Sequence, residues 1–509
     1  MSIVASLNIS QLQAVQYQGR YLLIIAGPGT GKTHTLTYRI AEYVRYLSSG
    51  QKILAITFTN KAAQEMRVRL MPRIIDLDEK VLIGTFHQFC LFLLKKYILE
   101  TSLPKDFQIV SQEQIKKIAQ ELWPDLKTKD LKDKLEGISR WKAMSFGQKK
   151  PRDVVLYDKH LRQYGFLDFD DLLCEAGALL KGNFRILKEI QKSFPHVFVD
   201  EYQDINCCQH DLLKLLVGPE NFLTAIGDPN QAIYGFRGAD VKFFESFQDD
   251  FQGAQEVFLS DNYRSSKDLL SASSQVITKS QTVSVAPLVA RIYLEGKLIV
   301  RENMTEKAEA EYVVHEIEKL VGGISMFSQD SGRVETDNID NKCFGDIAVF
   351  CRMKAQMSTL ANAFERSGIP YETPKIQEQE FLENPDIIRM NELYEKSERV
   401  QLMTLHAAKG LEFSVVFIVG CEEGLLPLNR EELITDIEEE RRLFYVGMTR
   451  AKEKLYLTYA KRRFLFGKKY HNETSRFIAD IHEELKQYEK DLFKPKKIKQ
   501  EAQGDLFSV

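Results

Sequence analysis

Apolar residues in the first half of the chain gather in short continuous runs, separated by polar stretches of helical character. Six runs have the length of strands: YLLIIA (21–26), ILAITFT (53–59), VLIGTF (81–86), VFVDE (197–201), FLTAIGD (222–228) and EVFLSDN (256–262). Continuous rather than alternating hydrophobicity is typical of parallel strands that helices cover on both faces. The pattern therefore predicts an α/β lobe.

This pattern changes twice along the chain. Residues 90–189 are Lys- and Leu-rich with almost no strand signal, which predicts a helical insertion in a first lobe formed by 1–89 and 190–261. A second lobe over 262–371 and 400–485 is predicted by the runs KLIVREN (297–303), DIAVFC (346–351), VQLMTLH (400–406), VVFIVG (415–420) and KLYLTYA (454–460). Two segments remain, a short connector at 372–399 and a charged, disordered tail at 486–509.

Composition agrees with this division and narrows the class of protein. A chain of 509 residues is too long for one hydrophobic core, and 44% hydrophobic with 28% charged residues is typical of a soluble globular protein. The sequence has no apolar run of transmembrane length and no secretory signal pattern, which predicts a cytoplasmic protein without a membrane partner. The seven cysteines lack CxxC spacing, which argues against a disulfide framework or a zinc module. A net charge of −3 means that any nucleic-acid binding must come from local residues.

A candidate phosphate-binding loop follows the first predicted strand. The stretch AGPGTGKT matches the pattern [AG]xxxxGK[ST], and its residues are predicted to bind ATP: Ala26, Gly27, Pro28, Gly29, Thr30, Gly31, Lys32 and Thr33. Glycines let backbone N–H groups turn toward phosphate oxygens, Lys32 supplies a positive charge, and the Thr33 hydroxyl can bind Mg²⁺ at a helix N-terminus. The alternative, a structural glycine-rich turn, is disfavoured by the strand before the loop and the helix after it.

Acidic residues end the fourth strand of the first lobe, in the sequence VDEYQD (199–204). Like charges this close repel one another unless a cation or a proton-transfer task recruits them. With the phosphate loop nearby, Asp200 is predicted to hold the Mg²⁺ that Thr33 touches, and Glu201 to orient or deprotonate the attacking water. Without that loop, the alternative interpretation is that these acids form a solvated strand end.

Ten segments together resemble the superfamily 1 DNA helicases of the UvrD/Rep type. In chain order they are LNISQLQAV (7–15), AGPGTGKT (26–33), TFTNKAAQEM (57–66), GTFHQF (84–89), DFDDLL (168–173), VDEYQD (199–204), GDPNQAIYGFRGA (227–239), NYRSS (262–266), TLHAAKGLEF (404–413) and EEERRLFYVGMTRA (438–451). The resemblance implies two RecA-like P-loop NTPase lobes. It also implies an ATP-driven motor that moves 3′ to 5′ along single-stranded DNA and unwinds 3′-tailed duplexes in repair, recombination or replication restart.

The resemblance also implies further contacts to the nucleotide. Gln11 would hydrogen-bond the adenine and Tyr263 would stack on it, while Glu412 would meet the sugar. His34 stands near the nucleotide where many relatives have Arg.

Three residues are implied to act on the γ-phosphate. Gln231 would sense it, and Arg264 and Arg450 would reach it from the second lobe. Arginines on a different lobe from Lys32 would make hydrolysis depend on closure of the lobes, because the transition state carries spread negative charge. Taken singly, either arginine would read as a former of surface salt bridges.

Aromatic residues resemble the platform on which this family stacks DNA bases. They are Phe58, Tyr234 and Phe236, and stacking is tolerant of sequence. Plain core packing is the alternative, for Phe58 above all. Backbone contacts are implied for Asn60, Lys61, His87, Arg237, Thr404 and His406.

The chain departs from the family pattern between its last two lobe segments. Full-length members carry a whole domain, called 2B, where this chain has only the 28 residues of 372–399, fewer than the roughly 50 that a domain needs. Motor activity is expected to survive this loss, whereas processive unwinding is put in doubt. Two alternatives to a helicase therefore stay open, namely a translocase that displaces bound proteins with little unwinding, and a nucleotide-gated DNA-binding module.

The tail contains QGDLF (503–507), which resembles the short peptide that docks DNA-processing proteins on a bacterial sliding clamp. Gln503, Leu506 and Phe507 would make that contact. The alternative is a disordered C-terminal segment that docks on nothing.

Overall fold

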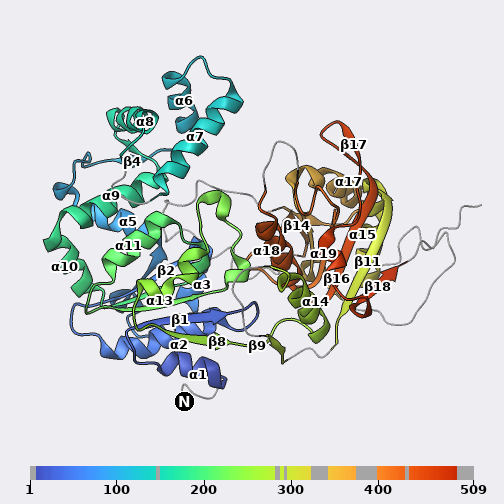
Figure 1. The fold of residues 1–509 in the computed structure, drawn as a ribbon, viewed down its shortest axis with the longest axis horizontal. Coiled ribbons are helices and arrows are strands. Elements are labelled where there is room, and N and C mark those ends of the chain that lie inside the picture. The colour runs from blue at the N-terminus through green and yellow to red at the C-terminus, as the bar shows by residue number, and fades with distance from the viewer. Residues whose placement is uncertain are drawn as a thin grey trace, which may run out of the picture.

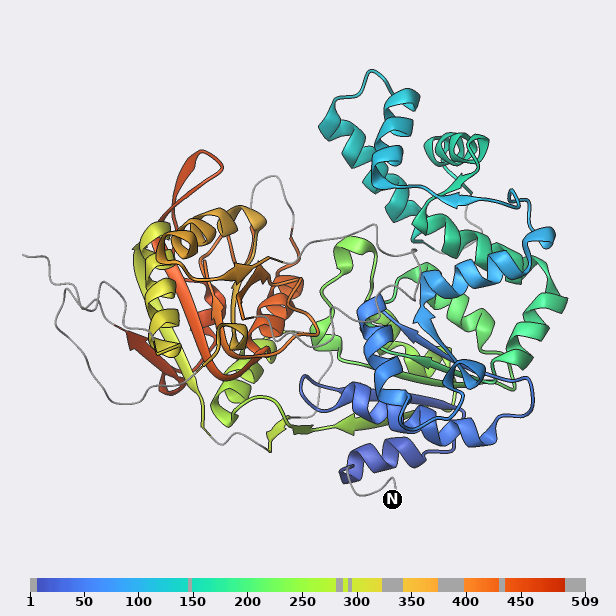
Figure 2. The same ribbon diagram turned by 180° about the vertical axis from the view of Figure 1, so that it is seen from behind.

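The protein has two α/β lobes side by side and a helical projection on the first lobe (Figures 1 and 2). The computed structural model describes residues 7–144, 149–280, 287–291, 295–322, 342–373, 398–429 and 435–489. Both predicted lobes are present, each built on a largely parallel sheet, so the predicted fold class is confirmed. In the described residues no helix is long and apolar enough to cross a membrane.

The first lobe contains a six-stranded, wholly parallel sheet in the order β3-β2-β6-β7-β1-β8. Its strands are β1 (Tyr21–Ala26), β2 (Ile53–Thr57), β3 (Val81–Thr85), β6 (His196–Val199), β7 (Phe222–Gly227) and β8 (Gln255–Leu259). All six predicted strands exist. Five of them end earlier than predicted, among them β2 before Phe58 and β6 before Asp200, so that the residues of chemical interest lie in loops beyond the strands.

Helices cover both faces of this sheet. They are α1 (Ile9–Gln16), α2 (Lys32–Tyr43), α3 (Asn60–Leu70), α4 (Leu77–Lys80), α5 (Phe86–Lys96), α9 (Phe169–Gly182), α10 (Phe184–Ser193), α11 (Cys207–Leu216), α12 (Lys242–Glu245) and α13 (Phe247–Asp250). In β1, Leu22 and Ile24 enter the core on one face, and Leu23 and Ile25 enter the core on the other. This two-sided burial explains why the strands are continuously apolar.

The helical insertion is smaller than the sequence predicted. Its own core joins α6 (Gln112–Leu122), α7 (Thr128–Lys142) and α8 (Arg152–Gln163), beside the two-residue strands β4 (Gln108–Ile109) and β5 (Phe166–Leu167). The predicted boundaries at 89/90 and 189/190 are wrong, because both fall inside helices, α5 and α10. Those helices and α9 pack in the same core as the sheet of the first lobe. Helical periodicity marked these residues as helical but could not show which core they join.

A buried lysine joins the insertion to the first lobe. Lys142, at the end of α7, places its Nζ 2.8 Å from Asp158 Oδ1, 2.7 Å from Asp168 Oδ2 and 2.7 Å from Asp171 Oδ1. The three carboxylates come from α8, from the N-cap of α9 and from its first turn. The DFDDLL segment is therefore an electrostatic junction, which fixes the angle between α7, α8 and α9.

Replacing Lys142 by methionine is expected to destabilise the insertion by about 3–5 kcal/mol, because three buried carboxylates lose their shared cation. Both tryptophans of the chain, Trp123 and Trp141, lie in the insertion, so the urea midpoint of their fluorescence reports on this part of the molecule. Lys132→Met on the same helix, where the side chain is 76% exposed, is the matched control and should change stability by less than about 0.5 kcal/mol. Equal midpoints for the two variants would contradict this role of Lys142.

The second lobe contains an eight-stranded sheet in the order β13-β14-β12-β15-β16-β11-β18, with β17 antiparallel to β16. Its strands are β11 (Lys297–Thr305), β12 (Ile347–Cys351), β13 (Tyr371–Glu372), β14 (Val400–Thr404), β15 (Phe413–Ile418), β16 (Ala451–Leu465), β17 (Lys468–His471) and β18 (Lys486–Glu489). Its helices are α14 (Lys267–Ile277), α15 (Glu306–Leu320), α17 (Met357–Ser367), α18 (Ile437–Met448) and α19 (Arg476–Ala479). Helices α14 and α18 pack in one core of the sheet, and α15 and α17 in the other. The short pair β9 (Asp261–Asn262) and β10 (Val289–Ala290) lies where the chain passes between the lobes.

The predicted disordered tail begins too early. Lys486–Glu489 forms β18, an edge strand parallel to β11, with Val300 opposite Tyr488. The sequence KQYE is polar because an edge strand exposes much of its surface, and backbone pairing rather than apolar burial holds it. Residues 490–509, with the clamp-like peptide, lie outside the described residues, as do 374–397 of the connector.

Candidate functional site

The candidate site lies beyond the carboxyl ends of β1, β6 and β7, on the side of the first lobe that meets the second. Ligand sites of parallel α/β sheets form at this edge, because the loops that leave the strands converge there. In Figures 1 and 2 a bright green segment of the first lobe, after β7, faces the second lobe. Hydrogen bonds across the interface tie this segment to α18.

The phosphate loop turns tightly between β1 and α2. Gly29 and Gly31 adopt left-handed φ values of 68° and 83°, and Gly31 is the N-cap of α2. A Cβ on Gly29 would lie 2.6 Å from the Arg264 Cβ, so a larger residue would force the two lobes apart at this point. The helix N-terminus and the inward-turned backbone amides form a site suited to an anion. Thr33 and His34 occupy the first turn of α2, where a phosphate-bound cation and the phosphates would be within reach.

Three side-chain and backbone contacts brace this loop. Asn262 Nδ2 donates to Pro28 O at 2.6 Å, the Tyr263 N–H donates to Gly29 O at 2.8 Å, and Gln11 Nε2 donates to Thr30 O at 3.0 Å. The structure therefore brings Gln11 and Tyr263, both predicted to hold adenine, to the same loop. Asn8 belongs to the group as well, because its Nδ2 donates to the Tyr263 hydroxyl at 2.9 Å. Asn8 was not predicted as a site residue, because an Asn before a helix is common as an N-cap, and Asn8 is also the N-cap of α1.

Asp200 and Glu201 follow β6 directly. The Asp200 N–H donates to Ile56 O at 2.9 Å, which extends the pairing with β2, and Glu201 then takes a left-handed φ of 51°. That turn, unusual for a residue with a side chain, ends the strand and separates the two carboxylates. Burial and the neighbouring Glu201 raise the pKa of Asp200. Burial alone would raise the pKa of Glu201 too, but the charges of Lys409 and Lys32 lower it. The two lysines therefore keep Glu201 ionised.

Lys32 lies in the phosphate loop, and its charge lowers the pKa of both acids. Its Nζ donates to the carbonyls of Ala26 at 3.0 Å and Gly27 at 3.3 Å. Burial and the positive charges of two arginines, Arg450 and Arg264, lower the pKa of Lys32, while Glu201 and Asp228 act to raise it. The geometry brings both predicted arginines of the second lobe to this region, Arg264 beside Gly29 and Arg450 on Gln231.

A chain of hydrogen bonds connects Arg450 of the second lobe to Asp228 of the first. Arg450 Nη2 donates to Gln231 Oε1 at 3.1 Å, and Gln231 Nε2 donates to Asp228 Oδ2 at 2.6 Å. The other hydrogen bonds of Arg450 go to Val446 O, Leu411 O and Thr449 Oγ1, which are uncharged. Burial and the like charge of Arg264 lower the pKa of Arg450 to about 9. A buried guanidinium among neutral acceptors is costly, and an anionic phosphate would compensate its charge.

Arg264 and Glu412 are also at the site and contact each other. Arg264 Nε lies 2.8 Å from Glu412 Oε2, and Lys452 Nζ lies 2.8 Å from Glu412 Oε1. Both arginines therefore meet the nucleotide side of the interface, Arg450 through Gln231 and Arg264 beside Gly29.

Besides Asn8, three residues of the site were missed as site residues. Lys409, in the turn after β14, contacts the carboxylates of Asp204 and Glu201, and Gln203 contacts the same two acids. Lys409 is the one lysine of the TLHAAKGLEF segment, and no motif spacing in the sequence links it to the acids after β6. Asp204 stood out in the sequence as part of an acidic cluster. In the structure, burial raises its pKa to about 7 despite the opposing charge of Lys409.

The predicted stacking residues form one continuous surface. Phe58 and Tyr234 stack at 4.9 Å, Tyr234 and Phe236 are 6.0 Å apart, and Phe236 meets the His406 ring edge-on at 5.5 Å. Arg237 lies 5.6 Å from both the Tyr234 and Phe236 ring centroids. Phe236 is 57% exposed, and Phe58 is half-buried rather than part of a closed core. The surface joins the first lobe to the second through His406.

The other residues predicted to contact DNA flank this surface to differing degrees. Asn60 and Lys61 begin α3, two and three residues after Phe58, and Thr404 ends β14, two residues before His406. His87 is in the first turn of α5, where its ring packs edge-on against Phe169 at 5.9 Å. Burial lowers the pKa of His87 to about 4, so His87 is a neutral hydrogen-bonding group rather than a cation for phosphates.

Phe58→Ala is expected to weaken binding of an oligo-dT strand by about 5- to 150-fold, the loss of one stacked base at about 1–3 kcal/mol. Fluorescence anisotropy of a labelled oligonucleotide measures it. Phe184→Ala, in which a side chain 71% exposed at the start of α10 is truncated, is the control and should bind as the wild type does. Unchanged affinity with a lowered thermal midpoint for Phe58→Ala would show that Phe58 serves packing instead.

The fold and the site together define a P-loop ATPase with two parallel-sheet lobes that share one nucleotide site. Residues 7–252 match the sequence model of the UvrD/REP helicase N-terminal domain, and residues 257–390 and 374–462 match that of the UvrD-like helicase C-terminal domain. The chain belongs to the UvrD/REP helicase family and is an ATP-hydrolysing DNA helicase.

Curated relatives agree with this assignment. The ATP-dependent DNA helicase PcrA of Staphylococcus epidermidis is 29% identical over 656 residues, covering 95% of this chain and 87% of the relative. The ATP-dependent DNA helicase PcrA of Staphylococcus aureus shows the same identity and the same coverage. Because the alignment is longer than the 509 residues of this chain, the relatives contain segments that this chain lacks.

Proposed function

We propose that the protein is a 3′ to 5′ translocase on single-stranded DNA that uses ATP and Mg²⁺ in the cytoplasm. Its task would be strand separation at 3′-tailed duplexes during repair, recombination or replication restart. One observation carries the proposal. The buried Arg450 of the second lobe joins Gln231 of the first at 3.1 Å, and Gln231 begins the segment that ends in the stacking residues Tyr234 and Phe236. One end of the segment 231–236 would thus contact the nucleotide, and the other end would contact DNA.

The roles of the residues follow from their positions. Lys32 would hold the β- and γ-phosphates, and Glu201 would align a water and accept its proton. Arg450 and Arg264 would compensate charge that spreads over the phosphoryl group in the transition state, which requires the lobes to stay together. Repeated closing and opening would shift the second lobe along the strand while the stacked bases change partners.

Mg²⁺ fits the donor set at this site. Thr33 and Asp200 would hold it, and it would neutralise charge on the phosphates. In the described residues no group of three or more His, Cys, Asp or Glu side chains could hold a metal alone. This agrees with a cation that depends on phosphate oxygens for its remaining ligands.

We propose that processive unwinding is reduced, because we interpret residues 372–399 as a short connector in place of the 2B domain that full-length members of the family carry. Two observations support that interpretation. The C-terminal family model matches in two pieces that meet at 374–390, inside the connector, and the relatives contain segments that this chain lacks. A translocase that displaces bound proteins is therefore the second candidate.

Two assays on the same protein separate these candidates. Arrival of the motor at a fluorophore on the 5′ end of an oligo-dT strand measures 3′ to 5′ translocation, and duplexes with a 3′ or a 5′ tail measure unwinding. Arrival at the 5′ end with unwinding of the 3′-tailed duplex supports the helicase, and arrival without unwinding supports the displacing translocase. Arrival only at the 3′ end would overturn the proposed polarity.

The tail is proposed to dock on a sliding clamp through Gln503, Leu506 and Phe507, which lie outside the described residues. A Leu506→Ala/Phe507→Ala double variant should lose clamp binding in calorimetry while its ATPase activity stays unchanged.

A further inference from the structure

A single lysine of the second lobe touches both the catalytic acids and the DNA-stacking surface. Lys409 Nζ contacts the Asp204 carboxylate, lies 3.6 Å from Glu201 Oε2, and donates to Gln231 O at 2.8 Å. Its side chain is only 8% exposed. The cation therefore sits among groups of the first lobe, although the turn after β14 of the second lobe carries it.

The same ammonium faces an aromatic ring on its other side. Lys409 Nζ lies 5.2 Å from the centroid of the Tyr234 ring, within the range of a cation–π contact. Tyr234 in turn stacks on Phe58 at 4.9 Å. A movement of Tyr234 would thus change the surroundings of Lys409, and a movement of Lys409 would change the surroundings of Glu201.

The segment between the two sites is held by the second lobe along its length. Arg450 donates to the side chain of Gln231, Arg442 Nε donates to Ala232 O at 2.8 Å, and Glu439 Oε1 accepts the Gly235 N–H at 3.1 Å. A Cβ on Gly235 would lie 2.5 Å from Glu439 Oε2, so glycine permits this approach. The segment is therefore positioned to transmit a shift from one end to the other.

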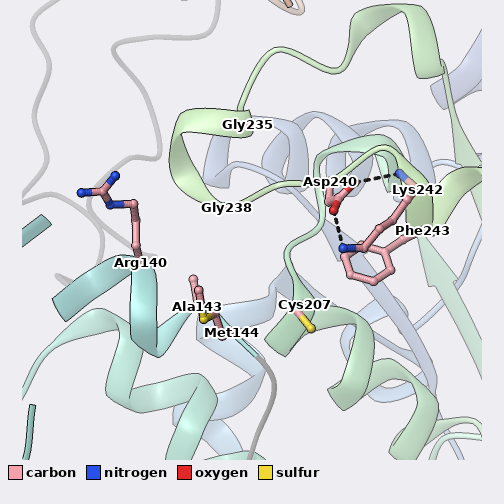
Figure 3. A pocket seen from close by; sticks show the side chains of 9 residues that line it. All are labelled: Arg140, Ala143, Met144, Cys207, Gly235, Gly238, Asp240, Lys242 and Phe243. Carbon is pink, nitrogen blue, oxygen red and sulfur yellow. Dashed lines mark hydrogen bonds and ion pairs between the residues drawn. The ribbon is translucent and has the colours of Figure 1, made fainter. Parts of the chain in front are cut away.

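Space exists for that shift on the opposite side of the segment. Gly235 and Gly238 border a cavity of about 310 Å³ between the turn η6 (Gly235–Arg237) and the helical insertion (Figure 3). The other lining residues are Arg140, Ala143, Met144, Cys207, Asp240, Lys242 and Phe243. The turn borders this cavity at Gly235, and at Gly238 it approaches the insertion, where an added Cβ would lie 3.3 Å from the Ala143 Cβ.

A base can enter between Phe58 and Tyr234 only if the two rings separate. Two stacked contacts need roughly 7 Å between the outer rings, twice the optimal carbon–carbon separation. The rings are now 4.9 Å apart, so insertion of a base must displace one of them, and Tyr234 directly precedes the turn η6 that borders the cavity.

We propose that Lys409 is a positioning residue that couples base stacking on Tyr234 to ATP hydrolysis. Without DNA, Lys409 pairs with Glu201 and Asp204, and a carboxylate held by an ammonium is a poor acceptor for the hydrogen of a water. A base that displaces Tyr234 draws Lys409 away and frees Glu201 to align the attacking water. The inference rests on the proposed function of Glu201 and of the stacking surface.

The test is steady-state ATPase activity of Lys409→Met, with and without saturating oligo-dT. The DNA-free kcat is expected to rise about tenfold and the stimulation by DNA to fall by about the same factor. The KM for ATP should stay within about threefold of the wild-type value, since Lys409 is not placed on the nucleotide. Lys409→Arg, which keeps the charge, should retain most of the stimulation.

Lys319→Met is the matched control, because Lys319 lies on α15, away from the interface, and likewise pairs with a buried carboxylate, that of Glu316. Lys409→Met leaves buried carboxylates unpaired, so the double variant Asp204→Asn/Lys409→Met is measured as well and judged by the same criteria. A fall in the DNA-free kcat, or unchanged stimulation in a folded variant, overturns the proposal.

A double-mutant cycle with Tyr234→Leu tests the path through the ring. If Lys409 responds to Tyr234, the two substitutions are non-additive in the logarithm of the stimulation, and additive effects would overturn the coupling. Absence of stimulation in the wild type would instead contradict the proposed function. Normal wild-type stimulation with equal stimulation of Lys409→Met would contradict the inference alone.

Discussion

Arg450→Met is expected to lower the DNA-saturated kcat by about 10³- to 10⁵-fold, the range for loss of an arginine that stabilises a phosphoryl-transfer transition state. Methionine fills much of the same volume but cannot donate to Gln231 or compensate a phosphate. Nucleotide affinity should change far less than kcat, because the phosphate loop and its braces by Gln11 and Asn262 remain. Rapid-quench turnover gives kcat, and a fluorescent ATP analogue gives affinity.

A control variant and the neutral surroundings of Arg450 make the Arg450→Met result decisive. Arg366→Met removes an arginine from the outer helix α17, whose side chain is 66% exposed, and should leave kcat unchanged. Removing the buried Arg450 charge is not expected to unfold the second lobe, because its acceptors there carry no charge and Val446 O still accepts a hydrogen bond from the Thr449 hydroxyl. A kcat within tenfold of the wild type would show that the second lobe does not complete the site.

Glu201→Gln is expected to lower the same kcat by about 10²- to 10⁴-fold, as for the loss of a general base. Glutamine keeps the size of the side chain and its hydrogen bond with Gln203 but cannot accept a proton from water. ATP and single-stranded DNA should both bind with little change, so the variant should accumulate on DNA in the presence of ATP.

Accumulation on DNA can be followed by anisotropy in parallel with turnover. Glu311→Gln on the surface of α15, where the side chain is 49% exposed, is the control for loss of one carboxylate. A Glu201→Gln enzyme that retains a tenth or more of the wild-type kcat would assign the base to another group. Asp204 would be the next residue to replace, since it lies beside Lys409 in the same buried cluster.

Short-range patterns predicted much of the fold correctly. Every predicted strand of both lobes exists, because runs such as YLLIIA bury side chains on both faces of a sheet and leave a continuous apolar signal. The phosphate loop was equally visible, since Gly29, Gly31 and Lys32 are consecutive parts of one turn. Local sequence suffices wherever neighbours in the chain are also neighbours in space.

Boundaries and partners could not be predicted in the same way. Helix α9 and parts of α5 and α10 were predicted to belong to the insertion, although all three pack on the first sheet, and the edge strand β18 was predicted to be part of a disordered tail. Lys409 was passed over because its partners, Asp204 and Glu201, are about two hundred residues away in the chain. No periodicity or spacing reports a contact of that range.

The sequence by itself determined the two parallel-sheet lobes, the phosphate loop and the acids after β6, because each depends on backbone conformation and burial within a few residues. Only the tertiary structure decided how Arg450, Gln231, Lys409 and Tyr234 meet, and that Lys142 gathers three carboxylates. These contacts join segments that approach one another only after both lobes have packed, so their energies depend on folding as a whole rather than on any local stretch.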